Sequence, residues 1–129
     1  MLEDVSTIDL PAPGQGNFGI VEYPPGGRHG PRRQRHHQLV LIHRGEARID
    51  IDQRTVPLAE GEVICLVPGH TLHFHFARRR ETEHSWVDLL YDDTPDALVN
   101  LPADPPLVKP IGPRLDRVMK FGLETRSWP

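Results

Sequence analysis

Short segments with the alternating apolar and polar residues of β-strands follow one another along residues 18–91, and this spacing constrains the fold more than any other feature of the chain. In residues 46–52, EARIDID, the side chains of Ala47, Ile49 and Ile51 share one face, which is typical of a half-buried strand. Turns that contain glycine or proline separate the segments, as in antiparallel sandwiches and small barrels. We therefore predict an all-β fold, an antiparallel β-barrel of the jelly-roll type. The expected strands are residues 18–23, 37–43, 46–52, 53–58, 62–67, 71–77 and 83–91.

The rest of the chain is expected to flank this barrel, which covers residues 18–91. Residues 1–17 are predicted as an irregular N-terminal arm, and residues 92–112 as a connector rich in proline and aspartate. Residues 113–125 begin with a proline and carry apolar residues at helical spacing, so they predict one amphipathic C-terminal α-helix. A helix this short needs a docking surface, which is either its own barrel or the equivalent helix of a partner chain.

Length and charge limit the classes of function. The 129 residues suffice for one ordinary domain, and the formal net charge of −3 argues against direct nucleic-acid binding, which usually requires a basic face. Two arginine clusters, in residues 28–35 and 78–80, are interpreted as solvated loops beside strands. The sequence contains no long apolar run and no apolar secretory signal, so we expect a cytoplasmic protein that does not contact a membrane. Cys65, the single cysteine, lies in the apolar stretch EVICLV and is expected to be buried and inert.

The turns between the predicted strands carry a further pattern. Gly45 follows one strand, Gly61 precedes another, and Pro68 and Gly69 form the turn between residues 62–67 and the next strand. This order of strands and turns resembles the cupin family, whose two motifs place histidines and a glutamate around a divalent metal inside the barrel. The resemblance implies a cupin-like barrel. It also raises the question of whether the three histidines in RHHQLVLIHRG, residues 35–45, hold a metal.

Counting from Gly45 and Gly61 assigns the cupin ligand positions in this chain. The glutamate position falls on Gln38, the second histidine position on Gln34 or Arg33, the first on Arg32 or Pro31, and the last on Leu72. Zinc and iron need several convergent histidine, cysteine or carboxylate ligands, and these residues do not supply them. We therefore expect no metal and no other cofactor in the barrel, unless a bulge of one residue turns His73 inward.

Alternation along the strands indicates which histidines face the interior of the barrel and which face outward. If Gln38 faces the interior, His36 faces the interior too, and Leu72, Phe74 and Phe76 share the inner face of another strand. The remaining strand histidines are then expected to be exposed, with a dimer face or a pH-sensitive patch as the functional alternative. These are His37, His43, His73 and His75.

Three stretches point to one branch of the cupins: PLAEGEVICLVPGHTLHFHF, TEHSWVDL and PPLVKPIGPRLDRVMKFGLE. Together they resemble the N-terminal effector-binding and dimerisation domain of AraC-type transcription regulators. His84 and Trp86 match positions at which the arabinose-responsive member of that family presents a histidine and a tryptophan to its sugar, and Phe74 matches an aromatic residue beside the sugar. The third stretch is similar to the approach to the family's dimerising helix. The resemblance spans most of residues 28–125.

The candidate ligand-binding residues are His36, Gln38, Phe74, His84 and Trp86. Trp86 and Phe74 would provide flat apolar walls, and the other three would provide hydrogen bonds, a mixture that suits a small polar organic molecule. The alternative is that Trp86 fills the barrel and His84 satisfies a buried backbone group. Arg33, near the expected mouth of the barrel, would neutralise a carboxylate or remain solvated. No set of residues forms a catalytic constellation in the sequence.

The resemblance and the residues together predict a domain that senses a small organic effector, forms a homodimer and is not an enzyme. The resemblance implies that DNA is contacted by a helix-turn-helix domain, which this chain does not contain. Two alternatives stay open. One is a stand-alone metal-dependent cupin enzyme, such as an isomerase or a dioxygenase, and the other is a ligand-free barrel that only dimerises.

Overall fold

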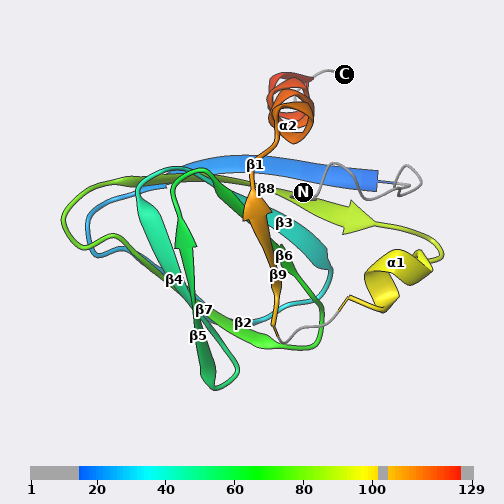
Figure 1. The fold of residues 1–129 in the computed structure, drawn as a ribbon, viewed down its shortest axis with the longest axis horizontal. Coiled ribbons are helices and arrows are strands. Elements are labelled where there is room, and N and C mark those ends of the chain that lie inside the picture. Colours follow the sequence, from blue (N-terminus) through cyan, green and yellow to red (C-terminus); the bar gives the residue numbers. More distant parts are fainter. Residues whose placement is uncertain (1–14, 102–104, 126–129) are drawn as a thin grey trace.

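The structure is a sandwich of two antiparallel β-sheets with a helix on one outer face (Figure 1). It is a computed structural model that describes residues 15–101 and 105–125. The strands are β1 (Gln15–Tyr23), β2 (Arg28–Arg33), β3 (His37–Arg44), β4 (Glu46–Ile51), β5 (Arg54–Ala59), β6 (Glu62–Leu66), β7 (Thr71–Phe76), β8 (Thr82–Leu90) and β9 (Leu107–Pro110), and the helices are α1 (Asp96–Val99) and α2 (Pro113–Thr125). One sheet has the order β1-β8-β3-β6-β9 and the other β2-β7-β4-β5. The predicted all-β fold with a C-terminal helix is confirmed.

Strand β3 is buried on both of its faces. Val40 and Ile42 point into the apolar core between the sheets, whereas Leu39 and Leu41 point outward into a second apolar cluster. A strand covered on both sides has a continuous apolar sequence instead of an alternating one, as LVLI does here. The core between the sheets consists of Val40, Ile42, Ala47, Ile49, Ile51, Leu58, Ile64, Leu66, Leu72, Phe74 and Phe76.

Helix α2 covers the outer face of the five-stranded sheet (Figure 1). Its residues Leu115 and Met119 are buried in the second apolar cluster. Gly122 brings the helix close to β1, because a Cβ atom at this position would lie 2.4 Å from the ring of Phe18. The helix therefore docks on its own sandwich, which is one of the two surfaces considered from the sequence.

Two strands lie where the sequence predicts irregular structure. Strand β2 occupies part of a predicted loop, and its pairing with β7 shifts register between His29 and Arg32, so its sequence lacks regular alternation. Strand β9 lies in the predicted connector and pairs with β6, but LVKP is too short to be recognised by alternation. Helix α1 lies in the same connector. Strand β1 begins at Gln15, inside the predicted N-terminal arm, and the rest of that arm lies outside the described residues.

The prediction that His37 is exposed is wrong. The side chain points away from the interior of the sandwich, but His37 is only 8% exposed. Its Nε2 donates a hydrogen bond of 3.1 Å to the backbone carbonyl of Leu98, in α1. Alternation correctly assigns the outward face, but a sequence pattern does not show that a helix from the connector covers that face.

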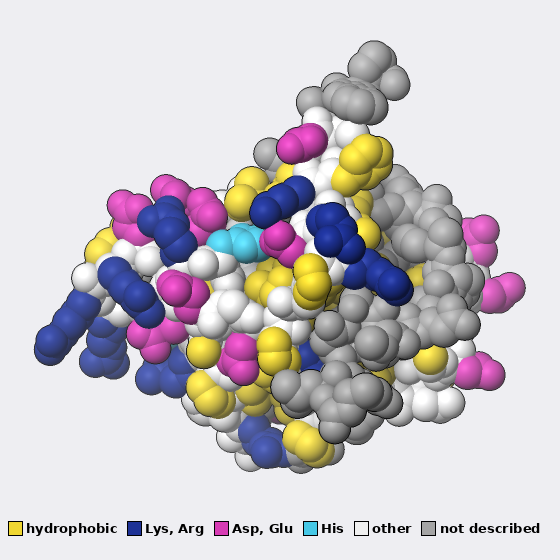
Figure 2. Space-filling view, turned by 45° about the horizontal axis from the view of Figure 1, so that its top comes forward, with side chains coloured by type: hydrophobic (Ala, Val, Ile, Leu, Met, Phe, Trp, Pro, Cys, Tyr) yellow, Lys and Arg dark blue, Asp and Glu magenta, His cyan; other side chains and the backbone are white. Residues whose placement is uncertain are grey.

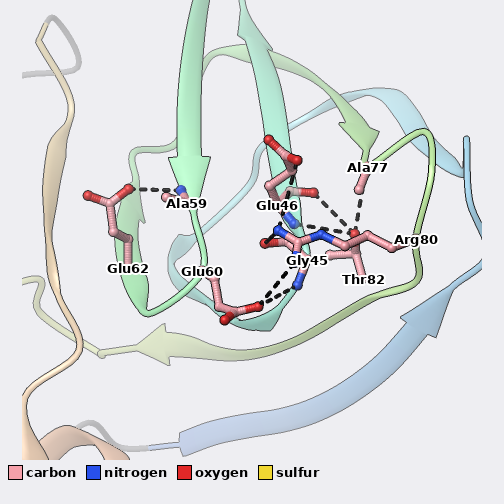
Figure 3. A network of polar contacts seen from close by, with 8 residues as sticks. All are labelled: Gly45, Glu46, Ala59, Glu60, Glu62, Ala77, Arg80 and Thr82. Atoms are coloured by element: carbon pink, nitrogen blue, oxygen red, sulfur yellow. Dashed lines mark hydrogen bonds and ion pairs between the residues drawn. The ribbon is translucent and has the colours of Figure 1, made fainter.

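The turn between β3 and β4 is fixed by a polar network (Figure 3). Gly45 has a φ of 88°, and a Cβ atom there would lie 2.5 Å from the Thr82 hydroxyl. The Thr82 hydroxyl, which is fully buried, donates to the Glu46 carbonyl (3.2 Å). Glu60 accepts from the Gly45 amide (3.0 Å), and Arg80 donates to the Gly45 carbonyl (3.3 Å). The network joins three turns at one end of the sandwich.

The described surface carries charges of both signs. Figure 2 shows basic side chains next to acidic ones at one end of the molecule. Among the ion pairs, Arg80 lies 3.8 Å from Glu60 and 4.0 Å from Glu46. Cys65 is buried, and burial raises the pKa of its thiol to about 11, in agreement with the inert thiol that the sequence predicts.

None of the described helices has the length and apolar character required to cross a membrane.

Candidate ligand-binding site

A cavity of about 340 Å³ lies between the two sheets. Its volume falls within the range of sites that enclose small organic ligands. Five strands contribute to its wall, namely β1, β2, β3, β7 and β8. The lining residues are Val21, Tyr23, His29, Arg32, Gln38, Val40, Phe74, Phe76, His84 and Trp86.

Aromatic rings form most of the cavity wall. Alternation along β7 and β8 turns Phe74 and Phe76, and His84 and Trp86, toward the same interior. The His84 ring stacks on Phe76 with a centroid distance of 5.2 Å, and the Phe76 ring stacks on Tyr23 at 4.2 Å. Such parallel rings present flat faces that accept a planar or apolar ligand body.

Arg32 carries a positive charge into this aromatic cavity. One terminal nitrogen, Nη1, donates to Gln34 Oε1 (2.6 Å), and Nη2 donates to Gln38 Oε1 (3.2 Å). Gln38 in turn donates to Asp88 Oδ1 (2.8 Å), and the guanidinium lies 5.9 Å from the ring centroid of Phe74. Burial lowers the pKa of Arg32 and Asp88 opposes that shift, so the guanidinium stays charged at neutral pH. Its Nε atom is buried and has no hydrogen-bond partner among the described residues.

His84 supplies a second buried polar atom that has no partner in the described part of the chain. His84 is 8% exposed, and its Nδ1 atom is buried and makes no hydrogen bond within residues 15–101 and 105–125. Burial, together with the nearby His29 and His43, lowers the pKa of His84 to about 4. The imidazole is therefore neutral at physiological pH, with one nitrogen as a donor and the other as an acceptor. A buried polar atom without a partner costs free energy, which a bound ligand could recover.

A family model, the AraC-like ligand binding domain, matches residues 15–119. The chain belongs to this family. The family match spans both sheets and most of α2, so the cavity lies within the matched region of this AraC-like domain. No curated protein matches the chain in sequence at a significant level.

Solved structures share the fold of this AraC-like domain at low sequence identity. ToxT from Vibrio cholerae, bound to (E)-4-(8-methylnaphthalen-1-yl)but-3-enoic acid, superimposes with a TM-score of 0.62 at 8% identity, over 88% of this chain and 49% of ToxT. A Pseudomonas aeruginosa protein described as glyoxylate-induced gives 0.59 at 18% identity, over 75% of this chain and 36% of that protein. A cupin-2 domain from Rhodospirillum rubrum gives 0.52 at 17% identity, over 65% and 60% of the two chains. The fold is that of the cupins.

The structure brings four of the five sequence-predicted site residues of the AraC-like domain together. Gln38, Phe74, His84 and Trp86 line the cavity. His36 is exposed and lines a neighbouring depression instead, together with Arg33 and other residues of the segment before β3. Strand β3 begins only at His37, so alternation along the strand does not extend back to His36.

Sequence reasoning missed Tyr23, His29 and Arg32 as cavity residues. Two of them lie on β2, which the sequence presents as a loop. A signal for Arg32 did exist, because counting back from Gly45 assigns Arg32 or Pro31 to the first cupin histidine position. That position faces the interior of the barrel in metal-binding cupins, and here it brings a guanidinium into the cavity.

The cavity of the AraC-like domain offers few metal ligands. Its described lining includes two histidines, His29 and His84, and no carboxylate or cysteine. The bulge that would turn His73 inward does not occur, because β7 alternates regularly and His73 lies on the outer face of the sheet. The cavity residues suit an organic molecule better than a metal ion.

Proposed function

We propose that the domain binds a small organic anion, such as an aromatic or aliphatic carboxylate, in the cavity between its sheets. The observation that carries the proposal is an aromatic wall beside two buried polar atoms, Arg32 Nε and His84 Nδ1, which have no hydrogen-bond partner among the residues that the structure describes. Arg32 would pair with the carboxylate, as arginine does in many anion sites, and the neutral His84 would donate a hydrogen bond. The aromatic rings would enclose the body of the ligand.

Two structural relatives support an anionic ligand. The ToxT structures contain a butenoic acid derivative in one case and an unsaturated fatty acid in the other. Both ligands are carboxylic acids with an apolar body. The resemblance in fold is at 8% identity, so the ligand class is carried over only as part of this proposal.

We further propose that binding regulates transcription as part of an AraC-type regulator in the cytoplasm. The domain would form a homodimer through α2, where the apolar side chains of Val118 and Phe121 are 51% and 65% exposed. DNA would be contacted by a separate helix-turn-helix domain, since this domain has a net charge of −3. The effector would act by binding two states of the regulator with different affinity.

A thermal-shift screen tests the ligand proposal. Benzoate, cinnamate and hexanoate would be compared with their carboxamides, because a ligand that binds only the folded state raises the melting temperature. We expect at least one acid to stabilise the domain and its amide to have a much smaller effect. Arg32→Gln should abolish this difference, whereas Arg33→Gln, which changes the exposed neighbouring arginine, should retain it. If the acid and its amide differ by the same amount in Arg32→Gln as in Arg33→Gln, the proposed role of Arg32 is refuted.

The metal-dependent enzyme gains no support from the cavity, where the described lining provides two imidazoles and no carboxylate. The AraC-like family membership also favours a binding domain. We therefore propose a sensor and not an enzyme.

A further inference from the structure

Three potential metal ligands meet on the outer face of the four-stranded sheet, away from the cavity. His73 and His75 are two residues apart on β7, so their side chains project from the same face. Asp50 lies directly opposite His73 on the neighbouring strand β4. One ligand atom from each of the three side chains lies within 4.8 Å of the other two.

The local contacts orient the three side chains toward one another. Asp50 Oδ2 lies 2.9 Å from His75 Nε2, and the rings of His73 and His75 have a centroid distance of 4.2 Å. The hydroxyl of Thr55, on β5, donates to the other carboxylate oxygen, Asp50 Oδ1 (2.9 Å). The pKa of Asp50 is lowered, mainly by this hydrogen bond from Thr55 and further by the contact with His75. One carboxylate oxygen of Asp50 is therefore held by Thr55, and the other lies against His75.

We propose that Asp50, His73 and His75 form a binding site for a divalent transition-metal ion such as Zn²⁺. Imidazole and carboxylate ligands suit zinc, nickel and copper, which bind at about 2.0–2.2 Å. Ligand atoms around such an ion lie roughly 3–4 Å apart, so small rotations of the side chains close the site. Three protein ligands leave at least one coordination position for water. The Thr55 hydroxyl holds the carboxylate as an outer-shell partner does in metal sites.

The surroundings set the expected strength of this site. Arg48 on β4 and Arg28 on β2 lie opposite His75, so two positive charges flank the ligands on the same face. The Asp50 carboxylate offsets one of them. His75 and Asp50 remain 23% and 37% exposed, so solvent screens these charges. We therefore expect moderate rather than very tight binding. The ion would also connect β4 to β7, the strand whose opposite face carries Phe74 into the cavity.

Calorimetric titration of the metal-free domain with zinc chloride tests the site. We expect one ion per domain and a loss of affinity of at least about tenfold in each of His73→Gln, His75→Gln and Asp50→Asn, because removing even an outer-shell partner commonly costs that much. The matched control is His70→Gln. His70, just before β7, also pairs with a carboxylate, that of Asp52, at 2.7 Å, but the described residues provide no third ligand there. Its substitution should leave the affinity unchanged.

A second measurement distinguishes coordination from loss of structure. Cobalt(II) added to the wild-type domain should give the visible absorption of a site with nitrogen and oxygen ligands. His73→Gln should lose that absorption and keep the wild-type circular dichroism and metal-free melting temperature, because His73 lies on the outer surface. The proposal is overturned if zinc binds with the same affinity to His73→Gln and His75→Gln, or if the folded wild-type domain binds no zinc.

Discussion

Replacing Gly19 by alanine is expected to destabilise the sandwich through one neighbour, the indole of Trp86. Gly19 on β1 lies directly opposite Trp86 on β8. An added Cβ atom would lie 2.0 Å from Trp86 Cζ2 and 2.3 Å from Cε2, whereas real Cβ contacts essentially never fall below 3.0 Å. Either the indole moves toward the cavity or the two strands separate.

The magnitude follows from two opposing effects. Overpacking of this kind costs about 1–3 kcal/mol. Alanine also gains about 0.5–1 kcal/mol over glycine in a strand, because it loses less conformational entropy on folding. We therefore expect Gly19→Ala to lower the free energy of unfolding by about 1–2 kcal/mol.

Urea denaturation followed by circular dichroism measures this change, and a second background identifies its cause. Trp86→Leu removes the ring atoms that the new Cβ atom would meet. In that background, Gly19→Ala should be neutral or stabilising, which gives a coupling energy between the two positions. An equal loss of stability in both backgrounds would refute the steric account.

Three further predictions concern the polar network, the cavity histidine and the helix. Thr82→Val should lower the free energy of unfolding by about 1–3 kcal/mol, since it leaves the Glu46 carbonyl without its side-chain donor, and Thr82→Ser should recover most of the loss in urea denaturation. The pKa of His84 is lowered from 6.5 to about 4, so between these pH values the imidazole binds a proton in the unfolded chain but not in the native state. Stability should fall as the pH decreases from 6.5 toward 4, and His84→Phe should reduce that loss by on the order of 2–3 kcal/mol; an unchanged pH profile would contradict the assigned burial. Phe121→Glu should convert a homodimer to monomers in light scattering without lowering the melting temperature, because Phe121 is 65% exposed; a dimer that survives this change would place the interface elsewhere.

Much of the sandwich could be predicted because apolar and polar residues alternate along its strands or because turn residues mark the ends of the strands. The alternation of β7 placed Phe74 inside and His73 outside, and both assignments hold in the structure. Alternation within a strand uses only local sequence. The resemblance to cupins and AraC-type domains suggested Gln38, His84 and Trp86 as interior residues, and the structure places all three around one cavity.

The features that the sequence did not predict depend on contacts between segments that are distant in the chain. Arg32 and His29 reach the cavity because β2 pairs with β7 despite a shift in register, and no local pattern reports such a pairing. His37 is buried because α1, which belongs to the connector and contains Leu98, 61 residues further along the chain, covers it. The cluster of Asp50 with His73 and His75 likewise requires the pairing of β4 with β7, which sequence alternation alone does not determine.

The central claim is that Arg32 selects an anionic ligand for the cavity, and one calorimetric comparison tests it most directly. The acid that gives the largest thermal shift and its carboxamide would be titrated into the wild-type domain and into Arg32→Gln. We predict that the wild type binds the acid at least about tenfold more tightly than the amide, since a charge-assisted pair contributes well over 1 kcal/mol, and that the variant loses this preference. A preference for the acid that persists in Arg32→Gln would contradict the account.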